Sequence, residues 1–143
     1  MKNSQNKQIM IKTLCIIEKD GKLLACKGYD SVKKETYFRL VGGTVNFGEG
    51  TEKALRREIK EELDSEIENL QFLTVVENIF TYEREAGHEI CFIYKGDLSN
   101  KEVYKKNYIP IDVDDFPAEW VPISEILSGK IKLYPAFDYK KIL

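Results

Sequence analysis

The segment 43–65, which runs from a glycine-rich loop into a charged helix, constrains this chain more than any other stretch. Its second half predicts a helix over Thr51–Leu63, because apolar residues recur there every four positions. Thr51 is the expected N-cap, since its hydroxyl can accept a hydrogen bond from the first helical turn. The apolar stripe consists of Leu55, Ile59 and Leu63. Such a stripe needs a partner surface, so the helix is expected to pack on other elements.

Three glutamates border this apolar stripe instead of facing away from it. They are Glu58, Glu61 and Glu62. At about 100° per residue, they share an arc of about 100° on the helix. Like charges at this spacing repel each other, so the arrangement requires a compensating positive charge. A hard divalent cation such as Mg²⁺ or Mn²⁺ supplies that charge, because it prefers carboxylate oxygens as ligands.

The glycine-rich loop before the helix strengthens the metal interpretation. Its glycines let the backbone bend and approach a metal ion or a phosphate group. They are Gly42, Gly43, Gly48 and Gly50. A metal ion held there can bridge phosphate oxygens and lower the pKa of bound water, and a spare carboxylate can then accept the proton. The alternative for the helix alone is a solvated charged surface with pairs such as Glu52–Arg56 and Arg57–Glu61.

Composition and charge exclude several classes of protein. The 143 residues fit one domain, 1–143, and 43% hydrophobic residues suffice for a core. A net charge of −2 argues against general nucleic-acid binding. No apolar run approaches the roughly 20 residues that span a bilayer, and residues 1–8 are too polar for a signal peptide. We therefore expect a cytoplasmic protein without a membrane partner. Its three cysteines, Cys15, Cys26 and Cys91, are expected to be buried thiols.

The remaining chain predicts strands around this central helix, and hence an α+β or layered α/β/α domain. Strands are expected at Ile9–Glu18, Lys22–Lys27, Tyr37–Val41, Leu70–Tyr82, His88–Gly96 and Trp120–Ile123. Short helices are expected at Ser124–Leu127 and within 134–143. Loops or irregular segments are expected at 28–34, 85–87 and 100–116.

Segment 43–65 resembles the signature of the Nudix hydrolase family. That signature is Gly, five residues, Glu, seven residues, Arg-Glu-aliphatic, one residue, Glu-Glu, one residue, and Gly-aliphatic. The matching residues are Gly43, Glu49, Arg57, Glu58, Ile59, Glu61 and Glu62. The last two positions differ, because Asp64 replaces the glycine and Ser65 replaces the aliphatic residue. We expect this difference to alter the helix cap and to leave the acids intact.

The resemblance implies a fold, a reaction and a set of roles. The family fold is an α/β/α sandwich with a mixed sheet, and water attacks one phosphorus of a nucleoside diphosphate linked to another group. The implied ligands of Mg²⁺ or Mn²⁺ are Glu58, Glu61, Glu62 and Gly43. Glu58 or Glu61 is also expected to help deprotonate the water. Arg57 is expected to orient the carboxylates, with Glu49 and Gly42 in support.

Residues outside the signature are candidates for contacting the substrate. Arg39 can donate two hydrogen bonds to a phosphate, although a surface ion pair is the alternative. Phe47 can stack on a base, as can Phe80, Tyr82 and Tyr104, whereas Trp120 is expected to anchor packing. His88 can contact a phosphate, with a structural hydrogen bond as the alternative. Members of the family often use a further acid, and the candidates are Glu89, Asp112, Asp114 and Asp115.

The leading hypothesis is a metal-dependent hydrolase of a nucleoside diphosphate derivative, such as ADP-ribose or a nucleotide sugar. That substrate class rests on segments 77–80 and 88–90, which resemble ADP-ribose pyrophosphatase-like members. Oxidised nucleoside triphosphates, dinucleoside polyphosphates and capped RNA stay open as alternatives. A non-catalytic nucleotide sensor is the second hypothesis, and the complete set of signature acids argues against it. A scaffold without a ligand is the third. Family members are often homodimers, and the sequence shows no interface.

Overall fold

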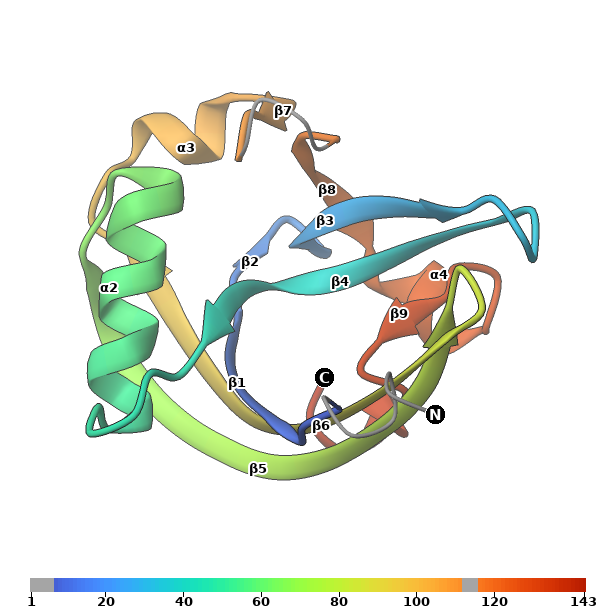
Figure 1. Ribbon diagram of the computed structural model, residues 1–143. Coiled ribbons are helices and arrows are strands. Elements are labelled where there is room, and N and C mark those ends of the chain that lie inside the picture. The colour runs from blue at the N-terminus through green and yellow to red at the C-terminus, as the bar shows by residue number, and fades with distance from the viewer. Residues whose placement is uncertain (1–6, 112–115) are drawn as a thin grey trace.

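The computed structural model describes residues 7–111 and 116–143, which form nine strands and three α-helices (Figure 1). The strands are β1 (Met10–Ile16), β2 (Glu18–Lys19), β3 (Lys22–Asp30), β4 (Glu35–Thr44), β5 (Ile67–Tyr82), β6 (Glu85–Leu98), β7 (Tyr108–Ile109), β8 (Ala118–Pro122) and β9 (Leu133–Tyr134). The helices are α2 (Thr51–Leu63), α3 (Glu102–Lys105) and α4 (Ile123–Leu127), and a 3₁₀ turn follows at Tyr139–Lys141.

The strands form one mixed sheet with the order β5-β6-β1-β4-β3-β8-β7. β1 pairs in parallel with β6 and antiparallel with β4. β4 reaches β1 only through its residues 41–44, whereas its residues 35–40 pair with β3. The β3–β4 hairpin and the β5–β6 hairpin therefore diverge from the place where β1 meets β4, as Figure 1 shows.

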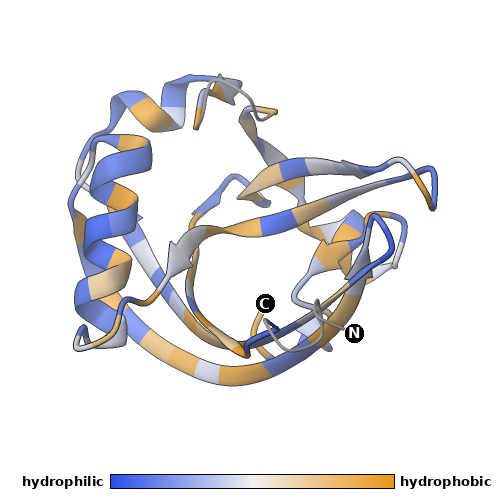
Figure 2. Ribbon diagram, viewed as in Figure 1, coloured by the Kyte–Doolittle hydropathy of each residue, from blue (hydrophilic) through white to orange (hydrophobic). Residues whose placement is uncertain are grey.

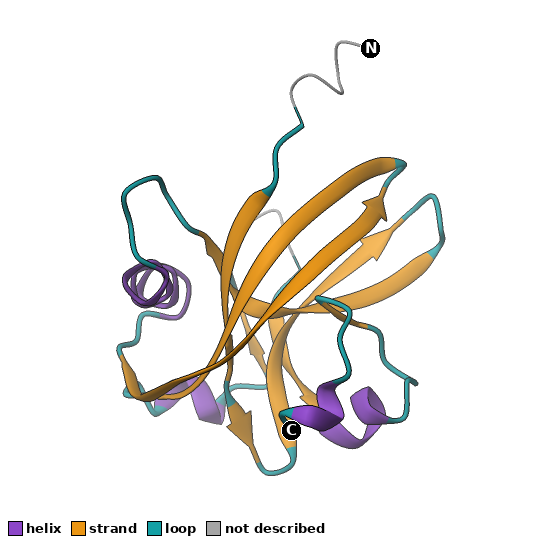
Figure 3. Ribbon diagram, turned by 90° about the horizontal axis from the view of Figure 1, so that it is seen from below, coloured by secondary structure: helices purple, strands orange, loops and turns teal. Residues whose placement is uncertain are grey.

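Helices cover both faces of this sheet. α2 buries Leu55 and Ile59 in a core with Val41 of β4, and α3 adds Val103 to the same core. α4 adds Ile126 to a second core. Each fully buried aliphatic side chain of this size stabilises the fold by roughly 1.5–3 kcal/mol. Figure 2 shows apolar and charged residues alternating along α2, and Figure 3 shows α2 nearly end-on, away from the helical segments beside the C-terminus. The predicted α/β/α fold with a mixed sheet is confirmed.

Helix α2 spans the predicted residues, but its N-cap differs from the prediction. Gly50 is the N-cap residue and makes no side-chain capping bond. The Thr51 hydroxyl lies 2.6 Å from the Tyr94 hydroxyl instead, and the Thr51 carbonyl accepts a 2.9 Å hydrogen bond from the Thr13 hydroxyl. Thr51 thus attaches the helix to β6 through its side chain and to β1 through its carbonyl, and the prediction of Thr51 as the cap was wrong.

Asp64 ends α2 in the left-handed conformation, with φ 51° and ψ 49°, and its backbone N–H donates to the Lys60 carbonyl. Glycine adopts this conformation without steric cost. We therefore expect Asp64→Gly to raise the free energy of unfolding by about 0.5–1 kcal/mol, and Asp64→Ala to lower it. The ion pair of Asp64 with Lys60 is exposed, so its loss changes little. Urea denaturation of both variants checks the order, and a less stable Asp64→Gly would contradict it.

Cross-strand pairing extends most strands beyond their predicted ends. β3 continues to Asp30 and β4 begins at Glu35, so only residues 31–34 of the predicted loop 28–34 form a turn. The turn between β5 and β6 consists of Glu83 and Arg84, both with positive φ, and not of residues 85–87. Segment 100–116, predicted to be irregular, contains α3 and β7. The predicted C-terminal helix is a single 3₁₀ turn.

The buried thiols were predicted correctly, since Cys15, Cys26 and Cys91 are all buried. Burial raises the pKa of the Cys15 and Cys91 thiols to about 12. Among residues 7–111 and 116–143, no helix has both the length and the apolar composition needed to cross a membrane.

Candidate active site

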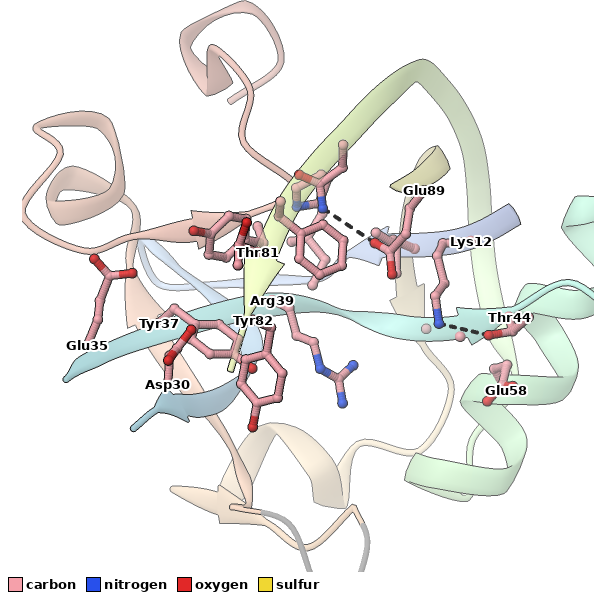
Figure 4. Close-up of a pocket in the computed structure, with 18 of the residues that line it drawn as sticks. Lys12, Asp30, Glu35, Tyr37, Arg39, Thr44, Glu58, Thr81, Tyr82 and Glu89 are labelled. Atoms are coloured by element: carbon pink, nitrogen blue, oxygen red, sulfur yellow. Dashed lines mark hydrogen bonds between the residues drawn. The ribbon is translucent and has the colours of Figure 1, made fainter. Parts of the chain in front are cut away.

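A cavity of about 480 Å³ lies between the two hairpins, and β1, β4, β5, β6 and α2 all contribute to its wall. Figure 4 shows Glu58 and Lys12 at one end, Tyr37 and Tyr82 at the other, and Arg39 between them. The charged end also contains Gly42, Gly43, Thr44, Glu62 and Glu89. The aromatic end also contains Phe80 and Tyr134. A cavity with one charged and one aromatic end suits a ligand that carries phosphates and a planar ring.

Arg57 connects the strand, the loop and the helix at the charged end. Its Nε and Nη2 donate to the two carboxylate oxygens of Glu49 at 2.7 and 2.9 Å. Nη1 lies 3.1 Å from Glu58 Oε1 and 3.4 Å from Glu61 Oε1. Nη2 also donates to the Thr44 carbonyl at 3.1 Å. One guanidinium therefore fixes both glutamates of the helix relative to the end of β4.

Glu49 is also held by the backbone of its own loop. The Asn46 backbone N–H donates to Glu49 Oε1 at 3.1 Å, and the Glu49 N–H donates to the Asn46 carbonyl at 3.0 Å. The two-pronged hydrogen bond from Arg57 lowers the pKa of Glu49 to about 2. Glu49 is thus an anion at any physiological pH, which keeps Arg57 paired and in place.

Glu58 lies directly against the backbone of Gly43. A Cβ built on Gly43 would lie 2.3 Å from Glu58 Cδ and 2.5 Å from its Oε1. A residue without a side chain is therefore required at position 43 for Glu58 to occupy its present place. The Glu58 side chain is 18% exposed, whereas that of Glu61 is 57% exposed and lies outside the cavity wall.

Glu62 carries an uncompensated polar atom. Its Oε1 is buried and has no hydrogen-bond partner among the residues that the structure describes. Burial raises the pKa of Glu62 to about 7, and the negative charges of Glu58 and Glu61 act in the same direction. Arg39 and the Gly42 backbone N–H partly offset that increase. A buried carboxylate oxygen without a partner is costly, so it indicates a missing ligand at this point of the cavity.

The raised pKa of Glu62 predicts a pH-dependent stability in metal-free buffer. The folded-state value of about 7 lies above the usual 4.5, so the protonated carboxyl stabilises the fold fully below 4.5. That contribution is lost as the pH rises through about 7. Compared with Glu62→Gln, the wild type should lose roughly 1–2 kcal/mol between about pH 5 and pH 8, after allowance for solvent screening. Urea denaturation with a chelator measures this difference, and a constant difference over that range would contradict it.

The other acids and bases of the charged end come from the sheet. Lys12 donates a 2.8 Å hydrogen bond to the Thr44 hydroxyl. Arg39 also lines the cavity, and among residues 7–111 and 116–143 its guanidinium makes no ion pair or side-chain hydrogen bond that would compete with a ligand. Glu89 lines the cavity beside Asn78, whose amide lies 3.4 Å from Glu89 Oε1. Two cations and one acid therefore face the same space as Glu58 and Glu62.

The structure does not bring every predicted residue to the cavity. Phe47 is fully exposed at the tip of the loop before α2 and lies outside the cavity wall. His88 lies 3.4 Å from Glu77 in an exposed pair. Tyr104 stacks on Trp120, with ring centroids 5.6 Å apart, on another part of the surface. Asp112, Asp114 and Asp115 lie outside the described residues. Phe80 and Tyr82 do line the cavity.

Sequence reasoning missed several residues of the cavity wall. They include Lys12, Asp30, Tyr37, Thr44, Asn78 and Tyr134. Lys12 had a detectable signal, because it is the one charged residue of β1 and lies on the same strand face as the buried Leu14 and Ile16. Thr44 follows Gly43 directly but occupies no fixed position of the signature. The others come from strands distant in sequence, so that no local pattern distinguishes them.

The donor set fits a divalent cation. Glu58 and Glu62 supply hard carboxylate oxygens at one end of the cavity, and the unpartnered Glu62 Oε1 is the atom that such an ion would satisfy. Among residues 7–111 and 116–143, no three His, Cys, Asp or Glu side chains converge as a metal-binding group. Glu61, the third predicted ligand, lies with Arg57 instead.

Comparison with known proteins identifies this fold. A model of the NUDIX domain family matches residues 10–141. The crystal structure of a MutT NUDIX hydrolase from Burkholderia pseudomallei has a TM-score of 0.62 and 24% sequence identity, over 82% of this chain and 86% of that chain. The solution structure of the E. coli ORF135 protein has a TM-score of 0.57 and 21% sequence identity, over 92% of this chain and 85% of that chain. The crystal structure of an ADP compounds hydrolase has a TM-score of 0.57 and 15% sequence identity, over 87% of this chain and 63% of that chain.

The fold is that of a Nudix domain. The chain belongs to the Nudix hydrolase family, because the family model covers nearly all of it. It is therefore a pyrophosphohydrolase of a family whose members typically depend on a divalent metal and act on nucleotide-derived substrates.

Proposed function

We propose that this protein uses Mg²⁺ or Mn²⁺ to cleave the diphosphate linkage of a nucleoside diphosphate derivative, such as ADP-ribose or a nucleotide sugar. The observation that carries the proposal is the buried oxygen of Glu62 beside Glu58, which has no partner among the described residues, at the charged end of the cavity. Such an oxygen supports a cation ligand there. The aromatic end supports a substrate with a base.

Glu58, Glu61, Glu62 and the backbone of Gly43 would hold the metal ion. When bound, the ion supplies positive charge to the phosphates and lowers the pKa of a bound water. Glu58 or Glu61 accepts the proton of the attacking water, and Arg57 orients both through its hydrogen bonds. Glu49 supports Arg57, and Gly42 donates its N–H towards Glu62. Glu61 has to turn away from Arg57 to join the set, and its exposure leaves it room to do so.

Arg39 and Glu89 complete the proposal from the sheet. Arg39 can bind a phosphate with two parallel hydrogen bonds, because no side chain of the described residues occupies its guanidinium. Glu89 is the further acid that the cavity itself contains, and it serves as an additional ligand or as the base. Phe47 would contact the substrate only if its loop folded over the cavity, since it is fully exposed here.

Two alternatives use the same site. Nucleoside triphosphates and dinucleoside polyphosphates carry the same diphosphate unit, so the charged end would accept them as well. A relative of this fold is an ADP compounds hydrolase, but at 15% identity that likeness supports the fold and not the substrate. A non-catalytic nucleotide sensor is the other alternative, and the complete set of acids argues against it. A cytoplasmic location and a homodimer stay predictions.

The decisive experiment is hydrolysis of a substrate panel with Mg²⁺ or Mn²⁺. The panel contains ADP-ribose, a UDP-sugar, a nucleoside triphosphate and a dinucleoside tetraphosphate. The wild type is compared with Glu58→Gln and Glu62→Gln, and with Glu52→Gln as the matched control. Glu52 is on the same helix, is exposed and pairs with Arg56. We expect metal-dependent turnover, reduced about 100-fold or more in the first two variants and unchanged in the control.

Metal binding, measured by calorimetry on the same four proteins, separates the alternatives. A wild type that binds Mn²⁺ and nucleotides but hydrolyses nothing would support the sensor. If Glu58→Gln and Glu62→Gln bound the cation as tightly as the wild type, the ligand assignment would be wrong. Turnover of the triphosphate alone would move the substrate class to the first alternative.

A further inference from the structure

The tips of the two long hairpins meet at the aromatic end of the cavity, and Asp30 joins them. Asp30 is the last residue of β3 and is 2% exposed. Its Oδ1 accepts hydrogen bonds from the backbone N–H groups of Val32 and Lys33, at 2.9 and 3.0 Å. Its Oδ2 accepts a 3.1 Å hydrogen bond from the Glu83 N–H, in the turn between β5 and β6. One carboxylate thus shapes its own turn and holds the opposite one.

Further contacts join the same two turns. The Ser31 hydroxyl donates to Glu83 Oε1 at 2.6 Å, and the Ser31 backbone N–H also donates to the Glu83 carboxylate. Lys33 Nζ donates to the Thr81 carbonyl at 2.6 Å. β4 and β5 are not neighbours in the sheet, so no ladder of backbone hydrogen bonds sets their separation at this end. These side-chain contacts, which we call the tip clamp, set it instead.

The aromatic rings beside the tip clamp come from both hairpins. Tyr37 of β4 lies edge to face with Tyr82 of β5, with centroids 6.0 Å apart and planes at 78°. Tyr37 also lies 5.5 Å from Tyr134, at 81°. Figure 4 shows Tyr37 and Tyr82 side by side next to Asp30. The relative position of these rings therefore depends on how the two hairpin tips are held.

Glycines allow two of the rings to lie against neighbouring backbone. A Cβ on Gly87 would lie 2.2 Å from Phe80 Cζ, and a Cβ on Gly28 would lie 2.4 Å from Tyr37 Cζ. Both rings occupy the space that a side chain would fill, and both line the cavity. Aromatic side chains that line a cavity bind planar rings through stacking or edge-to-face contacts.

We propose that Asp30 is a specificity-determining positioning residue, which holds the two hairpin tips at the separation that lets Tyr37 and Tyr82 receive the base of the substrate. This inference rests on the proposed function for the placement of the phosphates at the charged end. It goes beyond that function in two respects. The base of the substrate is assigned to the aromatic end, and the tip clamp is assigned the role of setting how well the base fits there. Asp30 acts through the rings and not on the reacting atoms.

The test compares Asp30→Asn with Asp97→Asn. The asparagine at position 30 keeps one oxygen for the Val32 and Lys33 N–H groups but turns an NH₂ towards the Glu83 N–H, so that mainly the link between the hairpins is lost. Asp97 pairs with Asn69 on the same β5–β6 hairpin, is exposed and lies outside the cavity wall, so it is the matched control. Calorimetry measures the Kd of each protein for AMP and for ribose 5-phosphate, which carries no base, alongside KM and kcat for the best substrate of the panel.

We expect Asp30→Asn to raise the Kd for AMP and the KM about tenfold, with little change in kcat or in the Kd for ribose 5-phosphate. Asp97→Asn should change none of these values. A wild type that binds AMP no more tightly than ribose 5-phosphate would overturn the inference, as would an equal loss of both ligands in Asp30→Asn. AMP binding without any hydrolysis would reject the proposed function while leaving the inference in place.

Discussion

Alanine at position 43 should lower the rate of diphosphate hydrolysis about 100-fold while the fold stays intact. The added Cβ would lie 2.3 Å from Glu58 Cδ and 2.6 Å from Oε2. The carboxylate has to move, and a misplacement of about 1 Å in a catalytic group costs on the order of 100-fold in rate. The displaced atoms are the end of a flexible side chain, so the free energy of unfolding should change by less than about 1 kcal/mol. Steady-state kinetics with Mg²⁺ and urea denaturation measure the two effects.

Gly50→Ala is the matched control for this prediction. Gly50 is in the same loop, and nothing lies within 4 Å of a Cβ built on it. Its φ of −72° suits alanine, so the rate should stay within about threefold of the wild type. If Gly43→Ala hydrolysed the substrate as fast as Gly50→Ala, the present position of the Glu58 carboxylate would have no role in catalysis.

Gly42→Ala should be the more destructive change, although it is only one residue away. Gly42 has a φ of 139°, which L-amino acids with a side chain rarely adopt. A Cβ there would lie 2.1 Å from the Thr13 carbonyl oxygen and 2.9 Å from Leu14 Cα. These are backbone atoms of the central strand β1, which cannot give way as a side chain can. We expect a loss of about 3 kcal/mol or more in the free energy of unfolding, or about 10 °C in Tm.

Gly21→Ala separates backbone strain from collision. Gly21 also has a positive φ, 76°, but nothing lies within 4 Å of its Cβ position. Its replacement should cost about 1 kcal/mol from strain alone. Differential scanning calorimetry of the two variants gives the comparison. Equal Tm values would show that the close approach of β4 to β1 at Gly42 contributes nothing to stability.

Local sequence patterns predicted α2 to the residue, because its apolar stripe and its charges follow one helical period and Asp64 accepts a left-handed backbone. The β5–β6 turn shows the limit of such patterns. Gly87 resembled a turn residue, yet it lies within β6, opposite Phe80, whose ring fills the space above it. The actual turn, Glu83–Arg84, has no glycine, and the Glu83 N–H is held by Asp30 from another hairpin. A contact between distant segments decided the turn.

The candidate site also contains residues that local spacing predicted and residues that only contacts between distant strands bring together. The spacing of the signature predicted the arrangement of Arg57 with Glu49, and the placement of Glu58 and Glu62 beside the glycines. Arg39 and Glu89 were predicted from single residues, and both line the cavity. The aromatic end was only partly anticipated, because Tyr37 and Tyr134 come together through β4 and β9, whose pairing no local pattern reveals. Glu61 and Glu62 are neighbours on the helix, yet Glu61 is exposed and pairs with Arg57, whereas Glu62 lines the cavity.

The Arg57 contacts have a practical consequence for labelling the protein. Because Arg57 holds Thr44 and Glu49, the ends of the loop are fixed by groups other than its tip, and Phe47 at that tip is fully exposed. All three native cysteines are buried, and the thiols of Cys15 and Cys91 have a pKa of about 12. A Phe47→Cys variant would therefore react selectively with a maleimide dye at the loop tip. Such a fluorophore would report movements of the loop during turnover without displacing the carboxylates behind it.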